Sequence, residues 1–254
     1  MAEWLTRGSQ KPVTVRSCGF NSHPRHFYLM DKYKTYAWTP KLAYAVGLIT
    51  TDGNLSSDKR HISLTSSDKQ LLSTFRECLN LTNKITKNIN GSFAKRQSYR
   101  IQFGNVLFYR WLITIGLMPR KTSRLAQIEI PDNFLRDFLR GHLDGDGSIV
   151  VYEDRYNTFK DPKYVYNRLY VNFLSASQKH IDWIAKKVKE ILDIKGNVSF
   201  DNRKGRGKRT KTIWKLRFAK KKSLRLLSWI YYKPDLPSLK RKQETYNNFL
   251  KFNN

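Results

Sequence analysis

The stretch AVGLITTDG (residues 45–53) has a counterpart in LRGHLDGDG (residues 139–147). Each is an apolar run with a glycine near its start, and the two end in Asp52-Gly53 and Asp146-Gly147. The two aspartates lie 94 positions apart (146 − 52), so one carboxylate recurs in two comparable halves of the chain. A single Asp-Gly pair is typical of a helix end followed by a turn. Its recurrence at equivalent positions indicates a duplicated unit.

The chain is strongly basic. It has 254 residues, with 48 Lys and Arg against 20 Asp and Glu, which gives a formal net charge of +28. Such an excess indicates a polyanionic partner, because each phosphate neutralised by Lys or Arg releases counterions. No stretch approaches the roughly 18 apolar residues of a membrane-spanning helix. Nucleic acid is therefore the expected partner, and a membrane is not.

Cysteine usage and the N-terminus bear on the compartment. Cys18 and Cys78 are the only cysteines, and they have neither CxxC nor Cys/His zinc spacing. The first residues lack a basic region followed by an apolar one, so no signal peptide is predicted. We expect an intracellular protein, cytoplasmic or organellar.

Hydrophobic spacing predicts the same order of elements in both halves: helix, two strands, helix, two strands, helix. The expected helices begin at Thr39-Pro40, at Ser67-Asp68, near Leu107, at Asn133, after Ser175 and near Leu224, and a last helix covers about 238–251. The expected strands lie near 61–65, 84–90, 98–104, 148–152, 169–173, 197–203 and 211–219.

This order predicts an α+β fold. It consists of two pseudo-symmetric αββαββα units with antiparallel, saddle-shaped sheets, and the helices of the two motifs pack at the central interface. We expect residues 1–38 to be an N-terminal extension, 39–118 the first repeat, 119–132 a linker, and 133–254 the second repeat with a C-terminal helix. Two copies are too few for a stacked array.

Small residues on the motif helices, such as Gly47 and Gly141, let two helix backbones approach closely. Side-by-side packing would bring Asp52 and Asp146 together at the negative ends of two helix dipoles, where the carboxylates repel each other. A hard divalent cation relieves this repulsion. It can also lower the pKa of an attacking water and stabilise charge on a phosphate.

Both stretches resemble the LAGLIDADG motif of homing endonucleases, in the arrangement with two motifs on one chain. The resemblance covers about 40–250 and implies a monomeric, site-specific double-strand DNA endonuclease, encoded in an intron or free-standing. It would hydrolyse phosphodiesters on both strands of a long pseudo-symmetric target with Mg²⁺, and Mn²⁺ or Ca²⁺ are alternative occupants of the same sites. Thr50-Thr51 departs from the usual Asp-Ala, but the terminal Asp-Gly is intact.

The resemblance also implies roles for individual residues. Asp52 and Asp146 would be catalytic metal ligands, and the backbone carbonyls of Thr51 and Gly145 would complete the metal shell. Lysines that follow the last helix of each unit would serve near the attacking water: Lys121 and Lys242, with Lys240 as an alternative. Asp144 has Thr50 as its counterpart in the first half, so we expect it to have a supporting or capping role.

Strand alternation selects the expected DNA-reading face. If Ile101 and Phe103 face the core, their neighbours face outward, where polar side chains suit base edges in the major groove. The cation-rich run 203–211 suits phosphate contact. The candidate DNA contacts are Asn54, Ser56, His61, Ser63, Thr65, Lys95, Arg96, Arg100, Gln102, Ser148, Asn172, Arg203, Arg206, Lys208, Arg209, Lys211, Lys215 and Arg217.

Two other functions use the same scaffold. One is an RNA maturase that assists splicing of its own group I intron and does not cleave DNA, which would make intron RNA a partner. The other is a transcription regulator on a degenerate scaffold. The second is disfavoured because degenerate versions tend to lose the acids that this chain retains.

Overall fold

The computed structural model describes residues 35–88, 97–204 and 210–253. Most of the expected extension, 1–38, lies outside the described residues, as do five candidate DNA contacts: Lys95, Arg96, Arg206, Lys208 and Arg209. The same holds for the side chains of two more candidates, Arg203 and Lys211. In the described part of the chain, every helix is too short or too polar to cross a bilayer.

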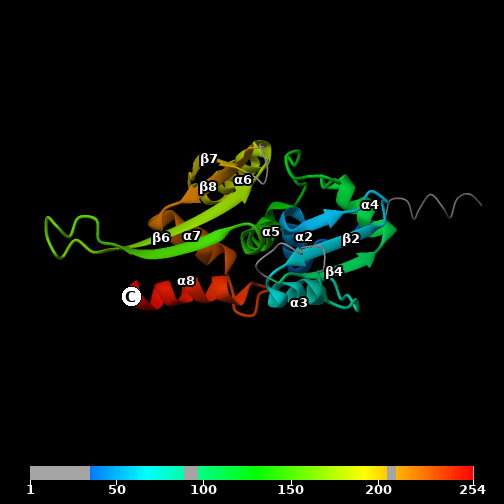
Figure 1. Ribbon diagram of the computed structural model, residues 1–254, viewed down its shortest axis with the longest axis horizontal. Helices are drawn as coiled ribbons and strands as arrows, with labels where there is room; N and C mark the ends of the chain where they lie inside the picture. The colour runs from blue at the N-terminus through cyan, green and yellow to red at the C-terminus, as the bar shows by residue number, and fades with distance from the viewer. Residues whose placement is uncertain (1–34, 89–96, 205–209, 254) are drawn as a thin grey trace, which may run out of the picture. The chain divides into compact units, whose positions relative to one another are not determined.

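The predicted repetition of elements is confirmed (Figure 1). The first unit contains α2 (Pro40–Thr51), β1 (Gly53–Leu55), β2 (His61–Ser66), α3 (Lys69–Cys78), β3 (Thr86–Lys87), β4 (Tyr99–Gly104) and α4 (Val106–Thr114). The second contains α5 (Asp132–Gly145), β5 (Ser148–Asp154), β6 (Tyr166–Ser175), α6 (Gln178–Leu192), β7 (Asn197–Lys204), β8 (Thr210–Phe218) and α7 (Lys220–Ile230), and α8 (Lys240–Asn253) follows it.

Each unit builds one antiparallel sheet of four strands, and the strand order is the same in both. The orders are β1-β2-β4-β3 and β5-β6-β8-β7. In the first sheet, Leu64 pairs with Ile101, and both side chains are fully buried against the helices. Ser63 pairs with Gln102 on the opposite face. The α+β class and the duplicated architecture are thus as predicted.

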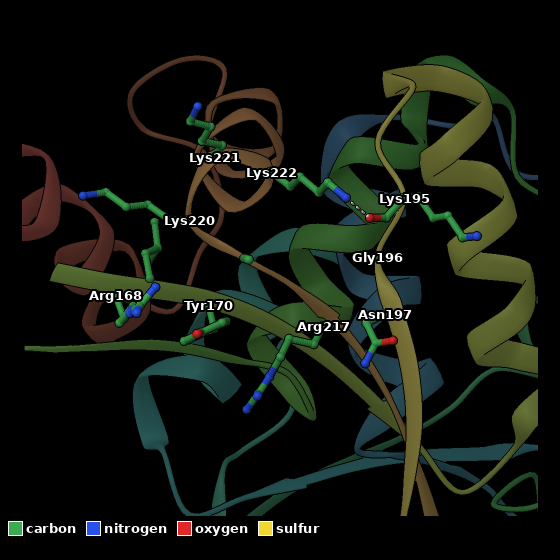
Figure 2. A pocket seen from close by; sticks show the side chains of 11 residues that line it. Arg168, Tyr170, Lys195, Gly196, Asn197, Arg217, Lys220, Lys221 and Lys222 are labelled. Carbon is green, nitrogen blue, oxygen red and sulfur yellow. Dashed lines mark hydrogen bonds between the residues drawn. The ribbon is translucent and has the colours of Figure 1, made fainter. Parts of the chain in front are cut away.

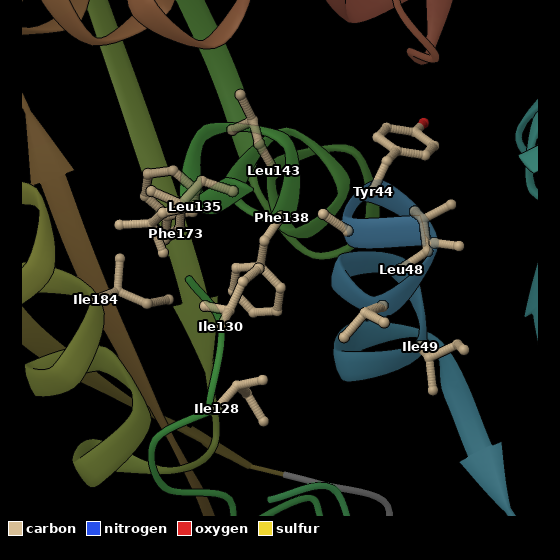
Figure 3. Packing of buried hydrophobic residues seen from close by; sticks show 14 of the residues in the cluster. Tyr44, Leu48, Ile49, Ile128, Ile130, Leu135, Phe138, Leu143, Phe173 and Ile184 are labelled. Atoms are coloured by element: carbon tan, nitrogen blue, oxygen red, sulfur yellow. The ribbon is translucent and has the colours of Figure 1, made fainter. Parts of the chain in front are cut away.

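The motif helices α2 and α5 pack directly against each other (Figure 3). Glycine permits this contact. A Cβ added to Gly47 would lie 2.8 Å from the backbone nitrogen of His142, and one added to Gly141 would lie 3.0 Å from the carbonyl carbon of Tyr44. Real Cβ atoms do not approach backbone so closely, so any side chain at these positions would force the helices apart. Leu48 and Phe138 extend the interface as fully buried apolar side chains.

The start of α5 differs from the prediction. Asn133 was expected to cap this helix, but the N-cap is Pro131, with φ −62° and ψ 140°, and no side-chain cap bond forms. Proline's fixed φ suits this extended position, and its carbonyl accepts from the backbone nitrogen of Phe134 at 2.9 Å. Asp132 then lies in the first turn, where the helix dipole favours a carboxylate.

Candidate active site

The two motif helices end in the same way. Asp52 is the C-cap of α2, with φ −84° and ψ −7°, and Asp146 is the C-cap of α5, with φ −86° and ψ −7°. The glycine after each is needed for the turn. A Cβ on Gly53 would lie 2.5 Å from the carbonyl oxygen of Ile49, and one on Gly147 would lie 2.8 Å from that of Leu143. Each Asp-Gly pair therefore marks the point where a motif helix ends and the chain turns tightly against its last turn.

The ends of the two helices touch. A Cβ added to Gly145 at the end of α5 would overlap the Thr51 side chain and lie 3.3 Å from Oδ2 of Asp52. The pKa of Asp52 is raised to about 6, mainly by burial and then by the Asp146 carboxylate. Asp146 is more exposed, and partial desolvation also raises its pKa. The structure thus brings both predicted aspartates into one electrostatic cluster.

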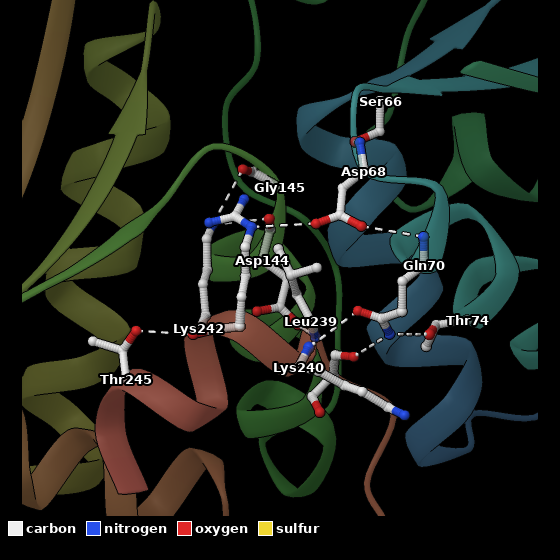
Figure 4. Close-up of polar contacts among 12 residues, drawn as sticks. Ser66, Asp68, Gln70, Thr74, Asp144, Gly145, Leu239, Lys240, Lys242 and Thr245 are labelled. Atoms are coloured by element: carbon white, nitrogen blue, oxygen red, sulfur yellow. Dashed lines mark hydrogen bonds and ion pairs between the residues drawn. The ribbon is translucent and has the colours of Figure 1, made fainter. Parts of the chain in front are cut away.

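Two lysines complete this cluster. The positive charges of Lys121 and Lys242 oppose the upward pKa shift of both Asp52 and Asp146. Burial lowers the pKa of Lys242 to about 8 and also lowers that of Lys121. Lys240, the alternative candidate, is exposed, and its backbone nitrogen donates to a glutamine on α3 at 3.1 Å (Figure 4). Lys242 is therefore the lysine of this segment that reaches the helix ends.

Each lysine also binds the carbonyls at the end of one motif helix. Lys121 Nζ donates to the carbonyl oxygens of Thr51 and Gly53, at 3.0 and 2.5 Å. Lys242 Nζ donates to four carbonyl oxygens at the end of α5, at 2.6, 2.9, 3.4 and 2.7 Å: those of Leu143, Asp144, Gly145 and Gly147. A cation suits the negative end of a helix dipole. The carbonyls expected to bind metal, on Thr51 and Gly145, are thus contacted by ammonium groups in this structure.

Asp144 is buried behind the site. Its Oδ2 accepts from the Tyr44 hydroxyl at 2.8 Å and from the backbone nitrogen of Leu239 at 2.7 Å, which joins α2, α5 and the segment that leads into α8 (Figure 4). Its counterpart Thr50 donates to the carbonyl of Val46 within its own helix at 2.7 Å. These contacts are those of a supporting residue. Tyr44 is a site residue that the motif pattern does not predict, although it lies three residues before Gly47 and hence on the same helix face.

The donors at the helix ends fit a hard divalent cation. They are carboxylate and carbonyl oxygens, and Mg²⁺ is commonly held by one or two carboxylates together with waters and substrate phosphates. Within the ranges that the structure describes, no group of three or more His, Cys, Asp or Glu side chains forms a metal cage. A cation here would accordingly rely on Asp52, Asp146, nearby backbone carbonyls and oxygens from outside the protein.

The candidate DNA contacts lie on one face of each sheet, opposite the core. Pairing aligns Asn54 with Ser63 and Ser63 with Gln102 in the first sheet. It aligns Asn172 with both Ser148 and Arg217 in the second. Of the candidates with described side chains, Asn54, Gln102 and Arg217 are exposed, and the half-buried ones are Ser56, His61, Thr65, Arg100, Ser148 and Lys215.

Two of these candidates are buried, contrary to the expectation that they face outward to solvent. Ser63 and Asn172 are only 3% and 5% exposed. Arg100 Nη2 donates to the Ser63 hydroxyl at 3.2 Å, and Arg217 Nε donates to Asn172 Oδ1 at 3.1 Å. In the structure, each buried side chain therefore holds an arginine in place on the open face of its sheet. The alternation of residues along a strand predicts on which face of the sheet a side chain lies. It does not predict whether a longer neighbouring side chain covers it.

Comparisons with known proteins agree with this architecture. Residues 39–114 match the LAGLIDADG-like domain family. No curated protein sequence matches the chain.

Among solved structures, the fold is similar to that of the LAGLIDADG meganuclease I-CpaMI bound to uncleaved DNA, with a TM-score of 0.54 and 13% identity over 85% of this chain and 90% of that one. It is also similar to the homing endonuclease I-LtrWI bound to target DNA, with a TM-score of 0.51 and 13% identity over 84% and 89% of the two chains. A third similar structure is the homing endonuclease I-WcaI bound to its DNA recognition sequence, with a TM-score of 0.50 and 13% identity over 86% and 93%. At these identities the likeness establishes the fold.

Proposed function

This chain is a LAGLIDADG-fold protein, and we propose that it is a site-specific homing endonuclease that uses a divalent metal to hydrolyse both strands of a long, pseudo-symmetric DNA target. The observation that carries the proposal is the meeting of the two motif helix ends. There, Asp52 and Asp146 share one electrostatic cluster with Lys121 and Lys242. Helix ends that needed only to stop would not require two like charges at a shared interface.

The paired carboxylates are unfavourable by themselves. Burial and the Asp146 charge disfavour the ionised form of Asp52, as its raised pKa records. Mg²⁺ at this point, with Mn²⁺ or Ca²⁺ as alternatives, would supply charge stabilisation on the phosphate and a lower pKa for an attacking water. Asp52 and Asp146 would hold it, with the carbonyls of Thr51 and Gly145 as further donors. Each of these carbonyl oxygens accepts from one lysine and has a second lone pair for a cation.

The two lysines provide positive charge on both sides of the carboxylate pair. Lys121 approaches from the segment that follows α4, and Lys242 approaches from α8. An ammonium group held this near a scissile phosphate stabilises negative charge that develops in the transition state. Because Lys242 has a pKa lowered to about 8, it also stands closer to proton exchange at neutral pH than an ordinary lysine.

The open sheet faces suit a duplex on the side away from the core. Each sheet presents hydrogen-bonding side chains at equivalent positions, with Arg100 and Gln102 in the first and Lys215 and Arg217 in the second. One sheet would read each half-site, since a β-ribbon fits the major groove. The duplicated fold accounts for a pseudo-symmetric target read by a single chain, and hence for a monomer.

A cleavage selection tests the proposal. Incubate the full chain with a library of long duplex targets and Mg²⁺, and sequence the cut ends. We expect wild type to cut, and Asp52→Asn/Asp146→Asn to bind the selected target without cutting it. The matched control is Asp182→Asn, because Asp182 is an exposed carboxylate on α6 and lies outside the cluster. Cleavage by the double variant would refute the assignment of the two aspartates.

The same variants address the maturase alternative. A maturase would assist splicing of its intron RNA without needing the two carboxylates. Splicing assistance by both wild type and the double variant, with no target cut by wild type, would replace the endonuclease proposal.

A further inference from the structure

The second sheet carries an exposed aromatic surface that has no counterpart among the described residues of the first sheet. Of the twelve exposed large apolar side chains among the described residues, eight lie within residues 150–166, on β5, on β6 or in the hairpin between them. The corresponding turn of the first unit, residues 56–60, reads SSDKR and contains no apolar residue. Water does not favour such a concentration of exposed apolar surface, so it marks an interaction site.

Three tyrosines lie on one face of β5 and β6. Tyr152 and Tyr170 lie on adjacent strands with their rings stacked, 6.1 Å between centroids and 21° between planes. The Arg217 guanidinium lies 4.7 Å from the centroid of the Tyr170 ring, and that of Arg168 lies 5.3 Å from that of Tyr166. We call Tyr152, Tyr166 and Tyr170 the aromatic platform. Strand pairing places it on the open face of the sheet.

The tip of the hairpin continues this surface. Tyr156 and Phe159 are 81% and 74% exposed, and their rings contact each other at 6.4 Å. Lys160 Nζ lies 5.5 Å from the centroid of the Phe159 ring. Aromatic rings that alternate with cations in this way resemble neither a core nor an ordinary solvated turn.

A basic pocket adjoins the platform (Figure 2). Its volume is about 510 Å³, and it opens where β8 gives way to α7, beside Tyr170. None of the described residues that line the pocket is acidic. Six of them are cationic: Arg168, Lys195, Arg217, Lys220, Lys221 and Lys222. The pocket therefore suits an anion, and two of its cations are the arginines that contact platform rings.

We propose that the aromatic platform and the basic pocket bind an unpaired stretch of nucleic acid. Its bases would stack on the tyrosines, and its phosphates would lie in the pocket. In a duplex, bases stack on one another and present only their edges, so they cannot use exposed rings in this way. An acidic protein segment would match the cations but would need aromatic side chains at a suitable spacing to use the platform, whereas every nucleotide carries a planar base beside a phosphate. This binding does not depend on cleavage, but Arg217 also lies on the face proposed for the duplex, so duplex and single strand would compete for it.

A binding measurement with the full chain tests the proposal. The probes are labelled oligouridine RNA, oligothymidine DNA of the same length, and a mixed-sequence duplex, each of about 20 nucleotides or base pairs, followed by fluorescence anisotropy. The variants are Tyr152→Leu and, at the tip, Tyr156→Leu/Phe159→Leu. Leucine keeps the site apolar but removes the ring. Phe200→Leu is the matched control, because Phe200 is 59% exposed and pairs with Trp214 on the other face of the same sheet.

We expect Tyr152→Leu, which removes one platform ring, and the tip variant each to weaken single-strand binding about tenfold. Duplex binding and the Phe200→Leu control should change less than about threefold. The comparison of RNA with DNA identifies the source of the unpaired strand. Equal weakening of duplex and single-strand binding would instead make the platform part of the duplex interface and overturn the proposal. Unchanged binding of all three probes would also overturn it and would direct attention to a protein partner.

The test is separate from that of the endonuclease. Asp52→Asn/Asp146→Asn should keep wild-type affinity for the single strand, and Tyr156→Leu/Phe159→Leu should keep target cleavage. The tip residues are so exposed that their replacement should leave the unfolding midpoint unchanged. A tip variant that folds normally and still binds single strands as wild type does would count against the tip's role in binding.

Discussion

Replacing Asp52 with Asn removes a negative charge that destabilises the folded state at the ends of the two motif helices. The pKa of Asp52 rises from 3.8 to about 6 on folding, chiefly through burial and then through Asp146. Each unit of pKa difference corresponds to 1.36 kcal/mol, so a rise in pKa from 3.8 to about 6 corresponds to about 3 kcal/mol. The wild-type carboxylate thus lowers the free energy of unfolding by up to about 3 kcal/mol at neutral pH when no cation is bound.

The sign follows from proton uptake. Between about pH 4 and pH 6, the folded state keeps the proton on Asp52 that the unfolded state releases. The stability contributed by this group therefore falls as pH rises through that window, and the full penalty applies above pH 6. We expect Asp52→Asn to be more stable than wild type at pH 7 by up to about 3 kcal/mol, and this advantage should shrink toward zero near pH 4.

Urea unfolding followed by circular dichroism, at several pH values with a chelator present, measures this difference. Adding Mg²⁺ should stabilise wild type and should stabilise the Asn variant less, because only wild type has both carboxylates. As a control, Asp58→Asn should lose stability at pH 7, because hydrogen bonds from His61 and from the backbone hold the pKa of Asp58 at about 2. A stability difference for Asp52→Asn that is independent of pH, or a less stable variant at pH 7, would refute the reasoning.

Three further predictions concern packing, a buried hydrogen bond and DNA reading. Gly141→Ala should lower the free energy of unfolding, measured by urea unfolding, by about 1–3 kcal/mol, because its Cβ would overlap the backbone of Tyr44. Gly104→Ala is the control and should change this free energy by less than about 0.5 kcal/mol, because the atoms nearest to its Cβ are side-chain atoms at 3.3 Å or more. Tyr44→Phe should cost about 1–3 kcal/mol in the same assay, because a buried carboxylate loses its hydroxyl donor at 2.8 Å, and an unchanged midpoint would contradict that role. Arg100→Ala should relax base preference at one or two target positions by about 1–3 kcal/mol in a binding selection, whereas a uniform loss across all sequences would mean that it contacts phosphate instead.

Local sequence patterns predicted most of the secondary structure. The Thr39 cap, the Asp68 cap and the alternation around Ile101 and Phe103 each appear in the structure as expected. These features depend on neighbours within four residues, so one chain carries enough information to identify them. The start of α5 was misplaced by two residues, because Pro131 and Asn133 both fit a helix start and only the backbone dihedrals distinguish them.

The active-site contacts were predicted only as far as a family pattern reaches. Lys121 and Lys242 were expected near the catalytic centre, but their bonds to the carbonyls at the helix ends were not. The burial of Ser63 beneath Arg100 was missed for a related reason. In each case a long, flexible side chain reaches a residue distant in sequence, and no local pattern records where it comes to rest.

The sequence by itself determines three features: two short helices each stop at an Asp-Gly pair, polar and apolar residues alternate on the strands, and the protein is strongly basic. It can do so because periodicity, turn chemistry and charge are properties of neighbouring residues or of composition. Folding decides that the two aspartates share one site, that their pKa values rise, and that tyrosines of two strands meet beside a basic pocket. Those properties depend on burial and on the electric fields of charged groups that lie between 25 (146 − 121) and 190 (242 − 52) positions away in sequence. These fields act at the site only once glycine has let the two motif helices come together.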